Sequence, residues 1–228
     1  NPARSWVITD RRNGRQQYVY LANFDWYNYL YDDSRPTWDH NINIKGGTKA
    51  LSYMVSGRYY QQKGVNRIEP DMFKSYNFRV KLQAEIKPWL TIASNTKFFQ
   101  SNYKYYGYED EYNNFRKPTL HALASFVPVN PDGTAVSHTS VTQSSTHYLM
   151  DGYNAMMQKG KSFGNKKTQE ITTTFEATFK LHKNFNIKAD FSYTQGYLHN
   201  DYRSVNVQYS QYPGEVMTEP EGSFPNKY

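Results

Sequence analysis

The stretch that decides the fold runs from Tyr76 to Phe99 and reads YNFRVKLQAEIKPWLTIASNTKFF. Side chains alternate across a β-strand, so every second residue shares a face. One face of the first strand is apolar throughout: Tyr76, Phe78, Val80, Leu82, Ala84 and Ile86. The other face is polar or charged throughout: Asn77, Arg79, Lys81, Gln83 and Glu85. A turn at Lys87-Pro88-Trp89 then leads into a second strand, predicted from Leu90 to Gln100.

The same alternation recurs downstream, and more weakly upstream. From Thr168 to Leu181 one face carries Ile171, Thr173, Phe175, Ala177, Phe179 and Leu181. After a turn at 182–184, a further strand places Phe185, Ile187, Ala189, Phe191 and Tyr193 on one face. Upstream, 41–44 lead through a Gly46-Gly47 turn into 52–60, where both faces carry large groups. Such strands reach the roughly 9–11 residues that cross a membrane, whereas soluble strands average about 5–6.

The connections between these strands alternate in length. Those near Gly46, Pro88 and Lys183 are short, whereas 61–74 and 101–167 are long and a third long one begins near Asn200. Short turns on one side and long loops on the other are typical of outer-membrane barrels. We therefore expect an all-β protein, an antiparallel transmembrane β-barrel. A soluble β-sandwich is the alternative, but it gives no reason to sort loops by side.

The number of strands predicts a part of a larger barrel. About six strands are clear and 18–21 and 204–209 are further candidates, whereas the smallest common barrels have about eight. We therefore expect residues 1–228 to belong to one barrel domain, and the chain to be mature and incomplete, because it shows no start Met and no signal peptide.

Composition fits a barrel and excludes some functions. Aromatic residues make up 17% of the chain, and Tyr76, Trp89, Phe98, Phe185 and Tyr197 lie near predicted strand ends, where barrels carry aromatic girdles. Sugar- or nucleic-acid-binding faces are an alternative source of this excess. The net charge is +7, but the basic residues are spread along the chain. This distribution indicates solvated loops and contact with outer-membrane lipid. We expect no nucleic acid as a partner. Cysteine is absent, which excludes thiol chemistry.

Several motifs occur in a fixed order between Phe24 and Gln100. They are Phe24-Asp25-Trp26-Tyr27, Asp39-His40-Asn41-Ile42-Asn43-Ile44-Lys45-Gly46-Gly47, Tyr59-Tyr60-Gln61-Gln62-Lys63-Gly64, Phe73-Lys74-Ser75-Tyr76-Asn77-Phe78-Arg79 and Lys87-Pro88-Trp89-Leu90. This order closely resembles the early barrel of SusC/RagA-type TonB-linked outer-membrane transporters (TonB-dependent receptors). The Asn130-Pro131-Asp132-Gly133-Thr134 loop is also familiar from that family. Ser75 and Lys45 depart from its commoner residues, Arg and Ser.

The resemblance implies a plugged barrel of about 22 strands in the outer membrane of a Gram-negative, Bacteroidota-type bacterium. It implies active import of oligosaccharides or oligopeptides, energy from TonB, and a SusD-like surface lipoprotein that lids the barrel. The plug and the N-terminal domain of the family are expected outside these residues. The alternative from another class is a non-transport barrel, an adhesin or assembly scaffold whose loops bind a partner.

Candidate contact residues for substrate or partner form the densest aromatic group, which is expected at the root of the long loop. They are Tyr103, Tyr105, Tyr106, Tyr108 and Tyr112. Flat rings with a polar tip suit sugars and peptide backbones; a girdle or loop-packing role is the alternative. Carboxylates at Asp32-Asp33 and Glu109-Asp110-Glu111 are oxygen ligands of the kind Ca²⁺ prefers, but their spacing is not that of a calcium loop.

No catalytic site is predicted. The six histidines are scattered without metal-ligand spacing, and no nucleophile motif or phosphate-binding glycine loop is present. We expect no enzyme activity, no catalytic residue, no resident metal and no cofactor.

Overall fold

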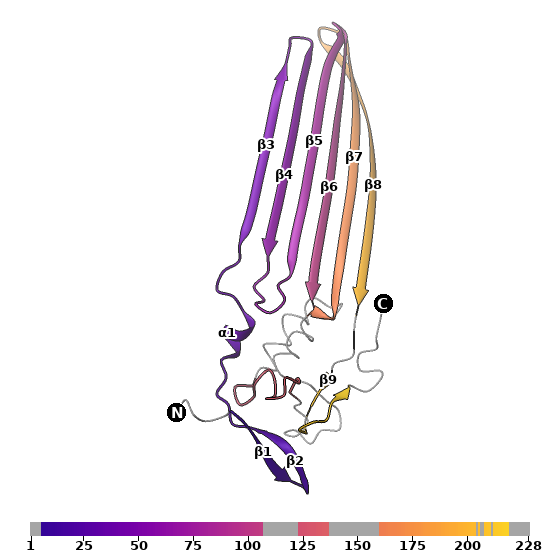
Figure 1. Ribbon diagram of the computed structural model, residues 1–228. Coiled ribbons are helices and arrows are strands. Elements are labelled where there is room, and N and C mark those ends of the chain that lie inside the picture. Colours follow the sequence, from indigo (N-terminus) through magenta and orange to yellow (C-terminus); the bar gives the residue numbers. More distant parts are fainter. Residues whose placement is uncertain are drawn as a thin grey trace.

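A computed structural model of the chain describes residues 6–106, 123–136, 160–203, 205, 208–210 and 212–218. Its largest element is a sheet of six long strands lying side by side (Figure 1). The strands are β3 (Thr37–Gly47), β4 (Leu51–Lys63), β5 (Met72–Lys87), β6 (Leu90–Tyr106), β7 (Phe163–His182) and β8 (Phe185–Arg203). Every strand pairs antiparallel with the next in sequence, so the predicted antiparallel meander is confirmed.

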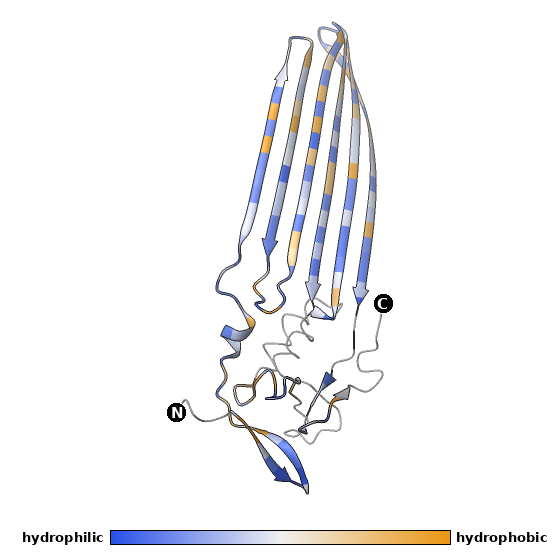
Figure 2. Ribbon diagram, in the orientation of Figure 1, coloured by the Kyte–Doolittle hydropathy of each residue, from blue (hydrophilic) through white to orange (hydrophobic). Residues whose placement is uncertain are grey.

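The register places whole rows of residues on one face of the sheet. Directly paired residues share a face, and one such row joins Ile44, Val55, Val80, Thr96, Thr173 and Tyr193. The next row along the strands, on the opposite face, joins Lys45, Met54, Lys81, Asn95, Thr174 and Ser192. The hydropathy colouring accordingly alternates along the strands (Figure 2). We call the face of Val80 the outer face and the face of Lys81 the inner face.

The outer face carries an apolar belt without charge. The belt consists of the outer positions from Ile92 to Gln100 on β6 and of the positions paired with them on the other five strands. None of these residues is Asp, Glu, Lys or Arg. Phe78, Phe175 and Phe191 lie in this belt with 48%, 55% and 65% of their surface exposed. Such an apolar surface is suited to hydrocarbon and not to water. The predicted two faces of β5 are therefore confirmed.

Aromatic rings border the belt at both ends. On the loop side, the row of Tyr76 also contains Tyr59, His40 and Tyr197, and the rings of Tyr59 and Tyr76 lie 5.2 Å apart. At the turn side, the rings of Trp89 and Phe179 stack at 6.4 Å. Phe98, which we expected in a girdle, lies one outer row further inside the belt.

Loop lengths are sorted by side, as predicted. Thr48–Ala50, Pro88–Trp89 and Lys183–Asn184 make the three turns at one end, and the longer connections lie at the other end (Figure 1). The expected limits of the longest loop were wrong. β6 continues to Tyr106 and β7 begins at Phe163, because the pairing of β6 with both neighbours extends beyond the apolar belt. The outer face turns polar in these extensions, so the hydropathy pattern alone predicts both strands too short.

Smaller elements gather at the loop end. They are β1 (Val7–Arg12), β2 (Arg15–Tyr20), α1 (Trp26–Leu30), β9 (Gln208–Tyr209) and β10 (Met217–Thr218). The strand expected at 18–21 exists, but it pairs with β1 in a separate hairpin and not with the large sheet. The strand expected at 204–209 is reduced to β9. Of the helices in the described part of the chain, none is long and apolar enough to span a membrane.

A charge on the outer face should be far more harmful than one on the inner face. We expect Val80→Arg, in the middle of the apolar belt, to destabilise the membrane-inserted protein by about 2–4 kcal/mol, because arginine at the bilayer midplane loses its hydration. Gln83→Arg is the matched control on the inner face of the same strand, and it should insert normally. Heat-modifiable mobility of outer-membrane fractions measures the folded amount; equal losses in the two variants would contradict the facing.

Candidate functional site: the inner face of the sheet

The inner face is hollowed and polar. A hollow of about 520 Å³ is lined, among other residues, by one row from five adjacent strands: Lys45, Met54, Lys81, Asn95 and Thr174. A second hollow of about 270 Å³ lies nearer the loop end, beside Asn43, Ser56 and Arg79. The sheet is therefore concave on its hydrophilic side, and polar groups from several strands point into one shared space.

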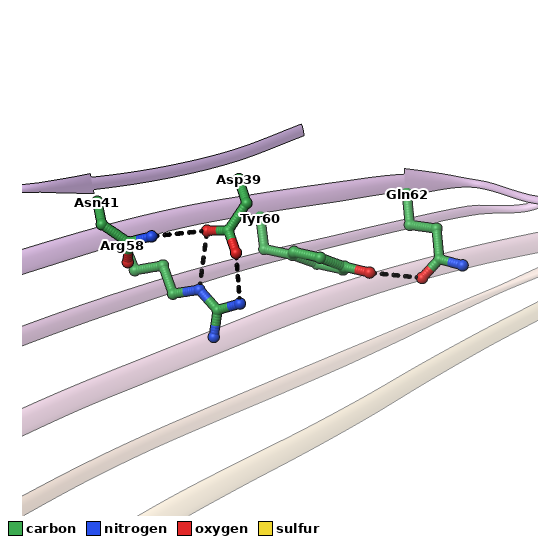
Figure 3. Close-up of polar contacts among 5 residues, drawn as sticks. All are labelled: Asp39, Asn41, Arg58, Tyr60 and Gln62. Carbon is green, nitrogen blue, oxygen red and sulfur yellow. Dashed lines mark hydrogen bonds and ion pairs between the residues drawn. The ribbon is translucent and has the colours of Figure 1, made fainter. Parts of the chain in front are cut away.

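An ion pair orders the loop-side part of this face. Arg58 donates to both oxygens of Asp39, from Nε at 2.9 Å and from Nη2 at 2.7 Å (Figure 3). Asn41 Nδ2 donates to the same carboxylate at 3.0 Å, and the Tyr60 hydroxyl lies 2.7 Å from the Gln62 amide. A two-pronged arginine–carboxylate contact fixes both side chains in direction. Because both side chains are partly exposed, the ion pair orients them but contributes little to the stability of the protein.

The middle of the inner face carries positive charge. Arg79 and Lys97 lie directly opposite each other on β5 and β6, and Lys45 and Lys81 lie on the adjacent inner row. Neither row contains Asp or Glu on any of its six strands. Arg79 donates to Asn95 at 2.8 Å. Like charges opposite each other are unfavourable in a sheet, so this basic group is suited to an anionic contact.

The acidic residues of the inner face lie on other rows than the basic centre: Glu170 is on the next row toward the loop end, and Glu176 is on the next row toward the turn end. Glu176 forms an ion pair with Lys188 at 2.7 Å, and Asp39 forms one with Arg58. Hydroxyl pairs cross the wall between β7 and β8, at 3.0 Å for Thr172–Thr194 and 2.7 Å for Thr174–Ser192. The face therefore combines hydroxyl and amide groups with a basic centre.

The loop end of the sheet is bordered by a small core that joins distant segments. Asp25 accepts the backbone N–H of Asn28 at 3.0 Å and so caps α1. Trp26, only 5% exposed, donates from Nε1 to the Leu123 carbonyl at 2.8 Å and packs with Leu30 and Phe126. The described part of the long connection is therefore fastened to the N-terminal segment.

A second anchor of the same connection is the turn at 130–134. The Asn130 side chain is buried, and its Nδ2 donates to the Ser210 carbonyl at 3.0 Å while its Oδ1 accepts from the Tyr20 hydroxyl at 2.8 Å. Gly133 adopts φ +84°, a left-handed conformation that favours glycine. The 130–134 loop is recognisable in the sequence, but no local pattern predicts the three-segment junction that Asn130 makes.

The predicted contact tyrosines divide into three groups. Tyr103 and Tyr105 lie on the inner face of β6 and stack at 5.5 Å, whereas Tyr106 lies on its outer face. Tyr105 is 4% exposed because its ring covers Gly164 on β7, where an added Cβ would meet the ring. These three belong to a strand, which corrects the expectation of a loop root. Tyr108 and Tyr112 lie outside the described residues.

Of the described carboxylates considered for a cation, Asp32 has protein partners. Arg67 donates to Asp32 at 2.9 Å and Lys63 lies at 3.3 Å, and these contacts hold the pKa of Asp32 below its ordinary value of 3.8. Their contribution is therefore present at neutral pH and is lost only as the pH falls through that lowered pKa. Glu109–Glu111 lie outside the described residues, and within the described ranges no three His, Asp or Glu side chains gather as metal ligands.

Solved transporter structures are similar to this chain. The RagAB peptide importer in its 'open-open' state aligns with a TM-score of 0.62 and 19% identity over 86% of this chain, and in its 'closed-closed' state with 0.54 and 21% over 78%. The likeness shows the fold, an antiparallel sheet that forms part of a β-barrel wall. It spans about a fifth of those chains, 22% and 20% respectively. No protein-family profile and no curated protein sequence matches.

Removing the Trp26 ring should release the long connection from the N-terminal segment. We expect Trp26→Ala to weaken this docking by about 3–5 kcal/mol, because a buried aromatic side chain and its hydrogen bond are lost. Tyr27→Ala is the control, since Tyr27 is 64% exposed one residue away. Hydrogen exchange of the Phe126 amide reports the docking, and equal protection in both variants would contradict the anchor.

Proposed function

We propose that this chain forms part of the wall of an outer-membrane barrel that imports peptides. In this proposal the barrel is a SusC-type transporter driven by TonB and covered by a SusD-like surface lipoprotein. The observation that carries the proposal is the pairing of a charge-free outer belt with a hollowed polar inner face across the same six strands. A wall with these two faces separates lipid from a hydrated passage.

Two further observations support transport over adhesion. The sequence motifs between Phe24 and Gln100 resemble those of SusC/RagA-type transporters, and the fold is similar to that of a peptide importer. An adhesin needs only its loops, whereas here the inner face carries ordered polar groups along the strands, including the Asp39–Arg58 pair. We therefore assign the inner face the role of contacting the substrate or the plug.

The basic centre of the inner face favours peptides over neutral oligosaccharides as substrate. Arg79 and Lys97 are opposite each other without a carboxylate on their row, and a peptide carries at least a terminal carboxylate. A neutral sugar offers no charge to balance this pair. Oligosaccharides remain the second substrate class implied by the motifs.

Uptake by the intact protein in its own host tests the proposed function. Deletion should abolish uptake of labelled oligopeptides, and loss of TonB should have the same effect, because entry against a gradient needs coupled energy. Arg79→Gln with Lys97→Gln should reduce uptake of acidic peptides about tenfold more than that of amidated, neutral ones, since about 1.4 kcal/mol of differential binding is tenfold. Unchanged uptake with lost surface attachment would favour the adhesin alternative.

The aromatic residues at the loop-side end of β6, and those that follow it in the sequence, should contribute to contact with the lid lipoprotein. We expect Tyr103→Ala, Tyr106→Ala and Tyr108→Ala together to weaken its co-purification by on the order of 1–3 kcal/mol, because rigid rings anchor interfaces. The corresponding Tyr→Phe triple variant keeps the rings and should retain the lid. Tyr105 is left unchanged, since its ring packs on Gly164. Full lid recovery with the alanine variant would assign these rings to packing alone.

A further inference from the structure

The outer face changes character just beyond its loop-side aromatic row. Inside the belt it carries no charged residue, but on the next outer row Lys74 and Lys167 appear, and on the row after that Lys104. Lys74 and Lys167 flank Asn102, which pairs with both of them, and Lys104 lies two residues beyond Asn102 on the same strand. Three lysines therefore form a triangle on three adjacent strands.

The triangle has the size of a phosphate site. Strands lie about 4.8 Å apart and rise about 3.4 Å per residue, so Lys74 and Lys167 are separated by about 10 Å at the backbone and each lies about 8 Å from Lys104. Lysine stems are long and flexible enough for three ammonium groups to approach one anion from these positions. Lys104 Nζ lies over two outer-face rings, 4.9 Å from the centre of the Tyr106 ring and 5.7 Å from that of Phe163, so aromatic side chains hold its ammonium group on the outer face.

The described carboxylates nearby do not satisfy this charge. Asp201 on β8 lies 2.7 Å from His199, and Asp32 is held by Lys63 and Arg67. Asp71, which precedes the partner of Lys104 on β5, accepts from the Tyr103 hydroxyl at 3.3 Å. Among the described residues, no ion pair to an Asp or Glu within 4.0 Å is made by Lys74, Lys104 or Lys167. The charge of the triangle therefore calls for an anion from outside this part of the protein.

The height of the triangle identifies the kind of anion. In a membrane barrel the aromatic row of Tyr59 and Tyr76 marks the border of the hydrocarbon, and headgroup phosphates lie directly beyond it. Lys74 is two residues past Tyr76 along β5, about 7 Å. The lysines face outward, toward lipid and away from the hollowed inner face. Their position beside the apolar belt therefore favours a ligand held in the bilayer.

We propose that Lys74, Lys104 and Lys167 bind a phosphate group of a phosphorylated glycolipid in the loop-side leaflet. The proposal rests on the proposed barrel function, since it needs the apolar belt to lie in hydrocarbon. The occupant is a lipid-borne phosphate and not a free one, because the site adjoins the belt and opens sideways. The bound lipid holds the strand ends of β5, β6 and β7 together beneath the long connections.

The test uses the full-length protein purified from the outer membrane. The probe is bisphosphorylated lipid A in detergent micelles, with dephosphorylated lipid A and inorganic phosphate as separate arms, and native mass spectrometry counts retained lipid. The test variant is Lys74→Gln with Lys104→Gln and Lys167→Gln. The matched control is Lys49→Gln with Lys87→Gln and Lys183→Gln, which removes the same charge at the turn end.

We expect the triangle variant to retain bisphosphorylated lipid A at least tenfold less well than the unmodified protein, and the turn-end control to retain it normally. Dephosphorylated lipid A should bind weakly and equally to all three proteins. Equal retention by the triangle variant, or equal loss in the control, would overturn the site. Competition by millimolar inorganic phosphate that matches lipid A would overturn the lipid assignment.

Failure of the site and failure of the barrel can be told apart. If the unmodified protein fractionates with the outer membrane but the triangle variant keeps its lipid, only the lipid site is wrong. If the unmodified protein is absent from the outer membrane, the barrel assignment is wrong and the lipid site falls with it.

Discussion

Every other feature of this sheet follows from the need to pair the backbone N–H and C=O groups of neighbouring strands. Hydrocarbon offers no partner to an N–H or C=O group, so a sheet can cross it only when every strand is paired along the crossing. β4 to β7 are paired on both sides over the apolar belt. Once this pairing is fixed, each residue faces either lipid or the interior, and a one-residue slip would carry Arg79 or Lys81 into hydrocarbon.

The two faces of the sheet solve different physical problems. The outer face must avoid charge, and it does so across six strands without Asp, Glu, Lys or Arg in the belt. The inner face must remain hydrated or be matched by polar partners, and its hydroxyl ladder and the Asp39–Arg58 pair meet that requirement. The two rows at the centre, with Arg79 opposite Lys97, depart from charge balance. We interpret that departure as a sign of function, because local repulsion has no structural benefit.

Much of the sheet could be predicted from the sequence, and the remainder could not, for identifiable reasons. Period-two alternation is a local signal, so 76–86, 168–181 and 185–193 were assigned with the correct faces. The strand ends beyond the belt were missed, because at Lys104 and Lys167 the outer face is polar and alternation disappears. The Asn13-Gly14 turn between β1 and β2 is a strong hairpin signal that was overlooked. The contact of Trp26 with Leu123 joins residues far apart in the chain, which no local pattern encodes.

Single-cysteine labelling can measure which residues of β5 face lipid, because the 228 residues contain no native cysteine. A fluorophore placed in turn at Asn77, Phe78, Arg79, Val80 and Lys81 of the reconstituted protein would be quenched by brominated lipid tails according to its exposure to hydrocarbon. We predict strong quenching at Phe78 and Val80 and weak quenching at Asn77, Arg79 and Lys81. Uniform quenching along the strand, or an alternation of the opposite phase, would contradict the barrel wall described here.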